Sequence, residues 1–508
     1  MTLLFFVAAA MVAWILASMR WLRVAQREHY LPGSVNRFTR RWWTLGPWNI
    51  SLAGIAIAAL GLGFLKPSTV LLSSGVVALG PLGLGLGGRS GPLHWTRRLK
   101  TLASFHLAIS VGLACLLTLW LSLAVISTAI ALLVPLSLEL ALRLTAPIQR
   151  REMDRFVTQA KLKLDAVAPR VVGITGSYGK TSTKQHLAHL ISTSVETLAS
   201  PASFNNRAGL ARTINEQLSP STQFFIAEMG TYGIGEIAEL CSWCRPEIAV
   251  LTAIGPVHLE RMGSMAAILE AKLEIAEKAK IVVVNVMDKR LGQVVDRLQR
   301  FGKEVITTAT AQTYQAQVVV DASIAPPVLI VRGVSRSLPG SLPEGVRAAN
   351  LASAFAVILG LGMDPFDFID RVANMPAVVN RATVGVAESG VIVIDDTFNA
   401  NPEGARAALA TLAAAAPKGR RVMVTPGMVE LGGQQDHENR DLAAAASKVV
   451  DTLVIVGRTN RASLLAGVSS RTTVVQMPTR DRAVAWVRRS LKERDGVLYE
   501  NDLPDHYP

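Results

Sequence analysis

The sequence predicts an N-terminal α-helical transmembrane domain at residues 1–150, followed by two α/β domains at residues 151–378 and 379–508. Three observations support this fold class. The 508-residue chain is half apolar and only 18% charged, whereas soluble proteins carry about 25% charged residues. Positive charge is concentrated in the first 150 residues, which hold 13 lysines and arginines against two acidic residues. Beyond residue 170, short β-branched runs alternate with helical stretches, which is typical of parallel sheets with crossover helices.

Four long segments of the first domain carry almost no charge. A membrane span needs about 20 apolar residues, and the last segment is long enough for two spans with a turn near Ser122. We therefore expect five spans, with four as the alternative. The segments are Thr2–Met19, Asn49–Leu65, Ser68–Gly88 and Thr101–Leu144.

Basic residues between these segments indicate an orientation. Arginines and lysines gather between the first and second spans, between the third and fourth, and after the last. Because such loops stay on the cytoplasmic side, the sequence predicts a multi-pass protein of the inner (cytoplasmic) membrane with both α/β domains in the cytoplasm. Span-flanking arginine also accounts for the net charge of +14, so we expect no nucleic-acid partner. The three cysteines are expected to be plain thiols.

The α/β part of the chain contains a series of candidate strands. Residues 303–345, rich in Pro and Gly, are expected to form short strands that close the central domain, and a second α/β domain is expected to begin near Val379. The other expected strands are Val171–Thr175, Phe224–Met229, Ile248–Ile254, Ile281–Val286, Val391–Asp395, Arg421–Thr425, Leu453–Val456 and Val497–Glu500.

The strongest motif, VVGITGSYGKTS, runs from Val171 to Ser182. An apolar strand leads into a glycine-rich turn and then into a helix that begins with a lysine and a threonine. Backbone N–H groups of such a turn converge on phosphate, the lysine reaches the terminal phosphates, and the threonine hydroxyl can bind Mg²⁺. The glycine spacing is one residue longer than in the ordinary Walker pattern. The predicted nucleotide-binding residues here are Gly176, Gly179, Lys180, Thr181 and Ser182.

Further along, the sequence resembles the Mur ligases, ATP-dependent amide ligases of peptidoglycan synthesis. The resemblance rests on TGxxGKT after a strand, EMG at Glu228–Gly230, and His258 followed 14 residues later by Lys272. Asp395–Pro402 is similar to the DDSYNANP signature, and Gly427–Gly432 to the GxMxELG signature, of members that add D-alanyl-D-alanine to a UDP-N-acetylmuramoyl-tripeptide.

This resemblance covers about residues 170–470. It implies a P-loop central ATPase domain, a Rossmann-like C-terminal domain, and ATP with two Mg²⁺ ions as cofactors. By resemblance, Thr181 and Glu228 hold one ion, and His258 and a carbamylated Lys272 hold the other, since carbamylation turns a cation into an oxygen ligand. The other implied roles are catalysis for Lys180, Lys272, His258 and Arg381; ATP binding for Asn350, Arg381 and Asp396; and substrate binding for Asn205, Asn206, Asn399 and Asn401.

The sequence departs from the family at several points. Apolar segments replace the family's UDP-binding domain, Ser177 and Tyr178 stand where Thr-Asn is usual, and His437 lies two residues early for the histidine that follows ELG. The C-terminal KGSRG run is missing. These departures leave the ATP chemistry in place and leave the UDP-sugar substrate open.

The predicted function is an ATP-dependent carbon–nitrogen ligase that works through an acyl phosphate at the cytoplasmic membrane face. It would join an amino acid, or a dipeptide such as D-Ala-D-Ala, to a cell-wall peptide precursor. A nucleotide-linked donor, a lipid-linked donor and a poly-γ-glutamate-type polymer remain alternatives, as does a non-enzymatic, nucleotide-binding membrane regulator. The expected partners are the membrane, ATP, the precursor, the amino acid or dipeptide and, as a further option, a cell-envelope protein.

Overall fold

The computed structural model describes residues 2–86, 93–118, 121–343, 345–376, 383–397, 401–503 and 507. These residues form two compact units. The helical unit comprises residues 1–153 together with 503–508, and the α/β unit comprises residues 154–502. The predicted boundary between two α/β domains, at 378/379, falls outside the described residues and stays a prediction.

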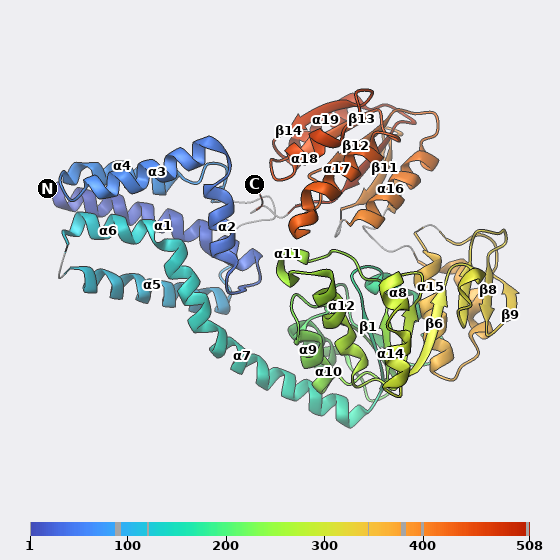
Figure 1. Cartoon of the computed structure of the whole chain (residues 1–508). Coiled ribbons are helices and arrows are strands. Elements are labelled where there is room, and N and C mark those ends of the chain that lie inside the picture. Colours follow the sequence, from blue (N-terminus) through green and yellow to red (C-terminus); the bar gives the residue numbers. More distant parts are fainter. Residues whose placement is uncertain are drawn as a thin grey trace. The chain divides into compact units, whose positions relative to one another are not determined.

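The helical unit packs short and long helices around an apolar core (Figure 1). Trp21, Phe38, Leu102 and Leu138 are buried in this core. The helices are α1 (Thr2–Arg27), α2 (Ser34–Trp43), α3 (Gly46–Leu62), the 3₁₀ turn η1 (Pro67–Thr69), α4 (Val70–Leu79), α5 (Arg97–Leu117), α6 (Leu123–Leu132) and α7 (Val134–Val167).

The prediction of five membrane spans is wrong. Within the described part of the chain, two helical segments, Leu3–Arg27 and Arg97–Leu117, have the length and hydropathy of a span. Two bent pairs, α2 with α3 and α6 with α7, would raise the number to four if each pair were one span. The segment predicted as the third span forms the ten-residue helix α4. At 1.5 Å per residue this helix covers about 15 Å, half of the ~30 Å apolar layer of a bilayer.

The first sheet of the α/β unit has nine strands in the order β2-β3-β1-β4-β5-β6-β7-β8-β9. All neighbours from β2 to β7 pair in parallel, and the last two pairs are antiparallel. Residues 303–345 supply the four strands at that end, in agreement with the prediction of closing strands. The bounds are β1 (Arg170–Thr175), β2 (Thr197–Ala199), β3 (Phe224–Glu228), β4 (Ile248–Leu251), β5 (Ile281–Asn285), β6 (Glu304–Ala309), β7 (Val318–Asp321), β8 (Val328–Val331) and β9 (Val334–Ser337).

Helices connect the parallel strands of this sheet, as the sequence pattern predicts. They are α8 (Lys180–Ile191), α9 (Arg207–Gln217), α10 (Glu236–Trp243), α11 (Leu259–Met262), α12 (Met265–Leu273), η2 (Glu274–Ala276), α13 (Lys289–Gly292), α14 (Val295–Arg300) and η3 (Gln312–Tyr314). After β9 the chain continues into α15 (Ala348–Gly360) and η4 (Pro365–Asn374).

The second sheet has six strands in the order β10-β11-β15-β12-β13-β14, and only the β10–β11 pair is antiparallel. The strand predicted last, at Val497–Glu500, lies in the interior of this sheet as β15. The strands are β10 (Thr383–Val386), β11 (Ile392–Asp396), β12 (Arg421–Thr425), β13 (Thr452–Val456), β14 (Thr473–Met477) and β15 (Gly496–Glu500), and the helices are α16 (Pro402–Ala415), η5 (Gly432–Gln434), α17 (Gln435–Ala446), α18 (Arg461–Gly467) and α19 (Arg480–Ser490).

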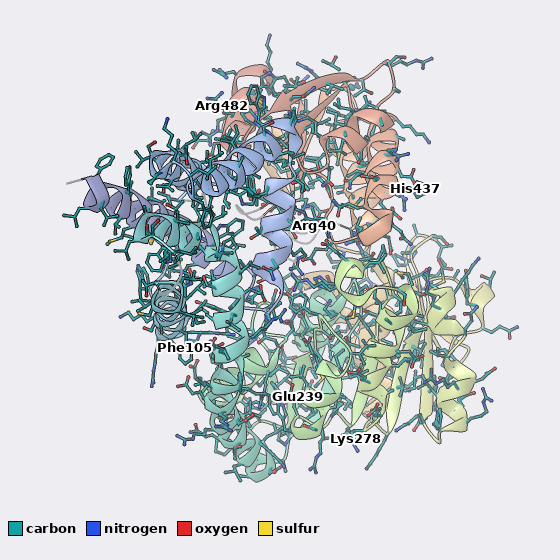
Figure 2. All side chains as sticks on the ribbon, turned by 60° about the vertical axis from the view of Figure 1, so that its left-hand side comes forward. Arg40, Phe105, Glu239, Lys278, His437 and Arg482 are labelled. Atoms are coloured by element: carbon teal, nitrogen blue, oxygen red, sulfur yellow. The ribbon has the colours of Figure 1, made fainter. Side chains whose placement is uncertain are left out.

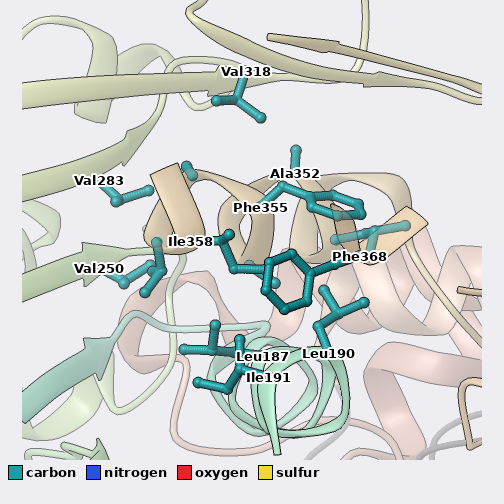
Figure 3. Packing of buried hydrophobic residues seen from close by; sticks show 14 of the residues in the cluster. Leu187, Leu190, Ile191, Val250, Val283, Val318, Ala352, Phe355, Ile358 and Phe368 are labelled. Carbon is teal, nitrogen blue, oxygen red and sulfur yellow. The ribbon is translucent and has the colours of Figure 1, made fainter. Parts of the chain in front are cut away.

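A buried cluster between α8, α15 and the first sheet fixes the helix that begins at the glycine-rich turn (Figure 3). Leu187, Leu190 and Ile191 of α8 meet Phe355 and Ile358 of α15 in this cluster. Because α8 carries Lys180 and Thr181 at its N-terminus, the packing also fixes the direction in which that N-terminus points.

Phe355→Ala is expected to lower the free energy of unfolding by about 3–5 kcal/mol, since Phe355 is fully buried and its truncation leaves a cavity. Urea denaturation measures the change. Phe301→Ala is the matched control, because this ring is 71% exposed, and its effect should stay within about 0.5 kcal/mol. Equal effects of the two variants would contradict the assignment of Phe355 to the core.

Candidate functional site

The glycine-rich turn follows β1 directly and ends at the first residue of α8. Gly176 and Gly179 have φ angles of +150° and +79°, which residues with a side chain rarely adopt. A Cβ atom on Gly176 would lie 1.9 Å from Thr252 Oγ1, and one on Gly179 would lie 2.5 Å from Asn350 Oδ1. The turn therefore needs glycine at both positions for backbone conformation and for close packing.

Lys180 occupies the first position of α8, and its ammonium folds back over the turn. Nζ donates to the carbonyl oxygens of Gly176 at 2.8 Å and of Ser177 at 3.4 Å. The helix N-terminus adds partial positive charge at the same place. The turn thus combines a glycine-rich backbone, a lysine and a helix N-terminus, the features that bind phosphate in other proteins.

The carboxylate of Glu228, at the carboxyl end of β3, lies beside the start of α8. Thr181 Oγ1 donates to Oε2 at 2.9 Å, and Asn205 Nδ2 donates to Oε1 at 3.1 Å. Lys184 Nζ lies 3.0 Å from Oε2. Burial by itself would raise the pKa of Glu228, but Lys184 and Lys180 lower it more strongly, and the pKa is held below its usual value. The structure therefore keeps an ionised carboxylate next to a threonine hydroxyl.

Lys272, on α12, is buried rather than solvated. Burial lowers the pKa of its amine to about 7, with a further contribution from the nearby charge of Lys180. The carboxylates of Glu236 and Glu274 oppose this shift only partly. Both accept backbone N–H groups around the start of α10. At neutral pH a large fraction of Lys272 is consequently the uncharged, nucleophilic amine.

His258 immediately precedes α11 in a left-handed conformation with φ of +58°. Its Nδ1 atom pairs with Glu430 Oε2, and its ring lies edge-on to Tyr232. Arg261 Nη2 also donates to Glu430, at 2.8 Å. Burial would raise the pKa of Glu430, but the bonds and charges of His258 and Arg261 lower it to about 2. Among the described residues no group of three or more His, Cys, Asp or Glu side chains could hold a metal, so His258 has Glu430 rather than a ready-made ligand set around it.

The remaining predicted site residues divide into two groups. Asn350 packs against Gly179, and Asp396 ends β11 beside β15. Asn206 and Asn401 instead cap helices: their side chains accept the N–H groups of Gly209 at 2.9 Å and of Gly404 at 2.8 Å. The substrate roles of these two stay predictions. Ser182 is buried in the first turn of α8, and Arg381 and Asn399 lie outside the described residues.

Three residues at these sites escaped the sequence prediction: Lys184, Glu430 and Glu500. Glu430 lies inside the ELG motif, which the sequence analysis had identified. Its contact with His258, 172 residues away, could not be predicted from the sequence. Lys184 follows Lys180 by one helical turn, and that spacing on one helix face was the available signal. His437, by contrast, is exposed on α17, where it pairs with Asp441 at 3.6 Å (Figure 2).

Glu500 is fully buried at the end of β15, next to Asp396 in the neighbouring strand. The hydroxyl of Thr425 donates to Oε2, whereas Oε1 has no hydrogen-bond partner. Burial raises the pKa of Glu500 to about 8; the Thr425 bond opposes this shift, and the charge of Asp396 adds to it. The protonated form is therefore the favoured one at neutral pH.

Glu500→Gln should raise the free energy of unfolding at pH 7–8 by about 1–3 kcal/mol and leave it unchanged near pH 4. Because the folded-state pKa lies above the unfolded value, the stabilisation by the proton is complete below the unfolded pKa and is lost as the pH rises toward about 8. Melting curves between pH 4 and pH 9 measure this slope. Glu493→Gln, at an exposed position, is the control, and a wild-type slope in Glu500→Gln would contradict the burial of a protonated carboxyl.

Comparison with known families matches the two sheets to two domains of one family. Residues 174–357 match the Mur ligase middle domain, and residues 380–499 match the Mur ligase glutamate ligase domain. The chain belongs to the Mur ligase family. The predicted family is thereby confirmed.

Among curated relatives, the UDP-N-acetylmuramoyl-tripeptide–D-alanyl-D-alanine ligase of Bacillus subtilis is 29% identical to this Mur ligase over 290 residues, or 57% of this chain and 62% of the relative. The enzyme of the same name from Mycobacterium leprae is 31% identical over 56% of this chain and 61% of its own length. The chain thus spans about three fifths of the length of these relatives.

Solved structures show the same fold. MurF from Acinetobacter baumannii matches with a TM-score of 0.59 at 22% identity, covering 69% of this chain and 77% of its own. MurF from Thermotoga maritima, solved in complex with ADP, matches with a TM-score of 0.58 at 24% identity, covering 69% and 80%. Central and C-terminal α/β domains of Mur ligase type are therefore confirmed.

The predicted multi-pass location in the inner membrane is wrong. The matched relatives are ligases named for a UDP-linked substrate, and the described helices include two with the length and hydropathy of a span where five were predicted. The prediction rested on apolar length and on the placement of basic residues, and neither shows where a helix ends. Part of the apolar sequence forms the ten-residue helices α4 and α6, and other apolar side chains, among them Trp21 and Phe38, pack in the core of the helical unit.

Proposed function

We propose that this Mur ligase joins D-alanyl-D-alanine to the peptide of a cell-wall precursor, using ATP and an acyl phosphate intermediate. One observation carries the proposal: the glycine-rich turn, Lys180 and the Thr181–Glu228 pair meet at the start of α8. This arrangement offers a phosphate site and a Mg²⁺ site side by side. The names of the relatives supply the substrates of the proposal.

The donor atoms at this place suit Mg²⁺. The ion prefers oxygen ligands, usually one or two protein oxygens together with phosphate oxygens and water. Thr181 Oγ1 and the ionised carboxylate of Glu228 are such oxygens, 2.9 Å apart. When bound, the ion would neutralise charge on the ATP phosphates.

We further propose that Lys272 is carbamylated. The uncharged amine is the form that attacks the carbon of CO₂, and the buried amine of Lys272, with a pKa of about 7, supplies it. A C–N bond forms and the nitrogen loses a proton. The product is an anion with oxygen ligands. A second Mg²⁺ ion, with His258 as another ligand, depends on this modification, because a protonated lysine repels the ion and an uncharged amine offers it no oxygen ligand.

The chemistry then requires two transfers. The precursor carboxylate attacks the γ-phosphorus, the bond to the β-phosphate oxygen breaks, and ADP leaves. The amine of the dipeptide attacks the acyl carbon, the carbon–oxygen bond to phosphate breaks, and a proton leaves the nitrogen. In this scheme Lys180 stabilises charge on the transferred phosphate, and Asn205 stands next to the carboxylate of Glu228, where the acyl phosphate would form.

The test uses the purified full-length protein with ATP, Mg²⁺, UDP-N-acetylmuramoyl-tripeptide and D-Ala-D-Ala. Mass spectrometry should detect the pentapeptide product, and phosphate release should require both the tripeptide and the dipeptide. A parallel reaction with a poly-γ-glutamate acceptor and glutamate tests the alternative ligase. If only that reaction gives an amide product, glutamate replaces D-Ala-D-Ala as the proposed amine substrate. Nucleotide binding with no amide product from either reaction would contradict the proposed activity.

A further inference from the structure

Lys184 is a buried cation for which the proposed reaction has no role. It lies on α8 one turn after Lys180, and its side chain is 2% exposed. Nζ lies 3.0 Å from Glu228 Oε2 and donates to the carbonyl oxygen of Ala202 at 2.6 Å. The ammonium is therefore fixed on both sides inside the protein.

The oxygen that Lys184 contacts is the one that also accepts the hydroxyl of Thr181. The second oxygen of Glu228 accepts from Asn205. Both carboxylate oxygens thus carry donors from protein groups, and one of these donors bears a full positive charge. A divalent cation that approached Oε2 would meet this charge at close range, where the low dielectric of the interior strengthens the repulsion.

A bound nucleotide would change this balance. The phosphates of ATP bring several negative charges to the turn at Gly176–Gly179, next to the same carboxylate. These charges attract Mg²⁺ more strongly than the single ammonium repels it, because the Coulomb energies of several phosphate charges add. Without nucleotide, the ammonium is the cation that neutralises Glu228.

We propose that Lys184 is a positioning residue whose ammonium takes the place of a divalent cation beside Glu228. Mg²⁺ then binds at this carboxylate only together with nucleotide phosphates. The proposal rests on the assignment of Thr181 and Glu228 to the Mg²⁺ site. It requires no particular ligase substrate.

The contact with Ala202 extends the role of Lys184 to the segment between β2 and α9. Ala202 has a φ of +41°, an uncommon value for a residue with a side chain, and the Lys184 bond ties its carbonyl to the buried site. The same segment carries Asn205, which binds Glu228 directly. Lys184 thereby joins the carboxylate to the segment that is proposed to face the substrate.

The test measures Mn²⁺ binding to the nucleotide-free protein by electron paramagnetic resonance, which detects free Mn²⁺. The wild type should bind Mn²⁺ weakly. Lys184→Met should bind it at least about tenfold more tightly, because the buried carboxylate has lost its counter-charge. Lys184→Arg, which retains the charge, should behave like the wild type.

Two further variants separate this role from a loss of structure. Lys163→Met removes another lysine that donates to a carbonyl, that of Asn215 at 2.9 Å, and should leave Mn²⁺ binding unchanged. The double variant Lys184→Met/Glu228→Gln should lose the gain in affinity. Thermal melting confirms that each variant is folded, and Lys184→Gln replaces Lys184→Met if the latter unfolds.

Tight Mn²⁺ binding by the nucleotide-free wild type would overturn the proposal, and so would unchanged or weaker binding by a folded Lys184→Met protein. Neither result depends on amide formation. If the ligation test fails while Lys184→Met gains affinity for Mn²⁺, the proposed function is wrong and the role of Lys184 stands.

Discussion

Lys180→Ala is expected to lower kcat for ligation by roughly 10²–10³-fold, which is typical for the loss of one preorganised group that stabilises transition-state charge. The ammonium of Lys180 already lies over the glycine-rich turn, 2.8 Å from the carbonyl oxygen of Gly176. The charge therefore stands where the γ-phosphate would be transferred. The fold should survive, because Lys180 takes no part in the buried cluster of α8.

Phosphate release in the presence of both substrates measures this effect, and thermal melting checks the fold. Lys278→Ala is the control, since this lysine is exposed on the same α/β unit (Figure 2). Lys278→Ala should retain wild-type kcat. A Lys180→Ala protein with near-normal turnover would refute the assignment of the turn to phosphate binding.

Lys272→Ala is expected to be the second large loss, of at least about 10²-fold in kcat, because it removes the proposed carbamate from the transferring phosphate. Formate or acetate should restore part of the activity by entering the space left by the side chain. Lys272→Arg should be as inactive as Lys272→Ala, since a guanidinium preserves positive charge and forms no carbamate.

The pH dependence of this modification has a definite sign. The amine of Lys272 has a pKa of about 7, and only its uncharged form reacts with CO₂. Carbamate occupancy should consequently rise as the pH increases through about 7. Carbon-13 NMR of protein equilibrated with ¹³C-labelled CO₂ should show one carbamate signal that is missing in Lys272→Ala, and an active wild type without this signal would exclude carbamylation.

The predicted site residues that the structure brings together are close in the chain or follow neighbouring parallel strands. Thr175 ends β1 and Glu228 ends β3, and these strands pair in parallel, so the turn and the carboxylate meet at the same sheet edge. The sequence placed each residue after a predicted strand, and the resemblance to the Mur ligases paired the two. The short-range motif, from Val171 to Ser182, needed no tertiary information.

The contacts that escaped prediction depend on how distant segments pack. His258 and Glu430 are 172 residues apart, and their contact depends on how the segments after β4 and β12 pack together. The family resemblance singled out Lys272, but the burial of its side chain depends on tertiary packing and could be seen only in the structure. The N-terminal segments misled the prediction because apolar length does not reveal where a helix ends: within the segment Ser68–Gly88, α4 is only ten residues long.

Transfer of ¹⁸O from the substrate carboxylate to phosphate tests the proposed ligase mechanism most directly. The tripeptide precursor is labelled with ¹⁸O in its reacting carboxylate and incubated with the protein, ATP, Mg²⁺ and D-Ala-D-Ala. Attack of that carboxylate on the γ-phosphorus, followed by amide formation, leaves one labelled oxygen in each phosphate released. Mass spectrometry of the phosphate should therefore show one ¹⁸O atom for each pentapeptide formed. Unlabelled phosphate, released with or without amide formation, would contradict the acyl phosphate and with it the proposed function.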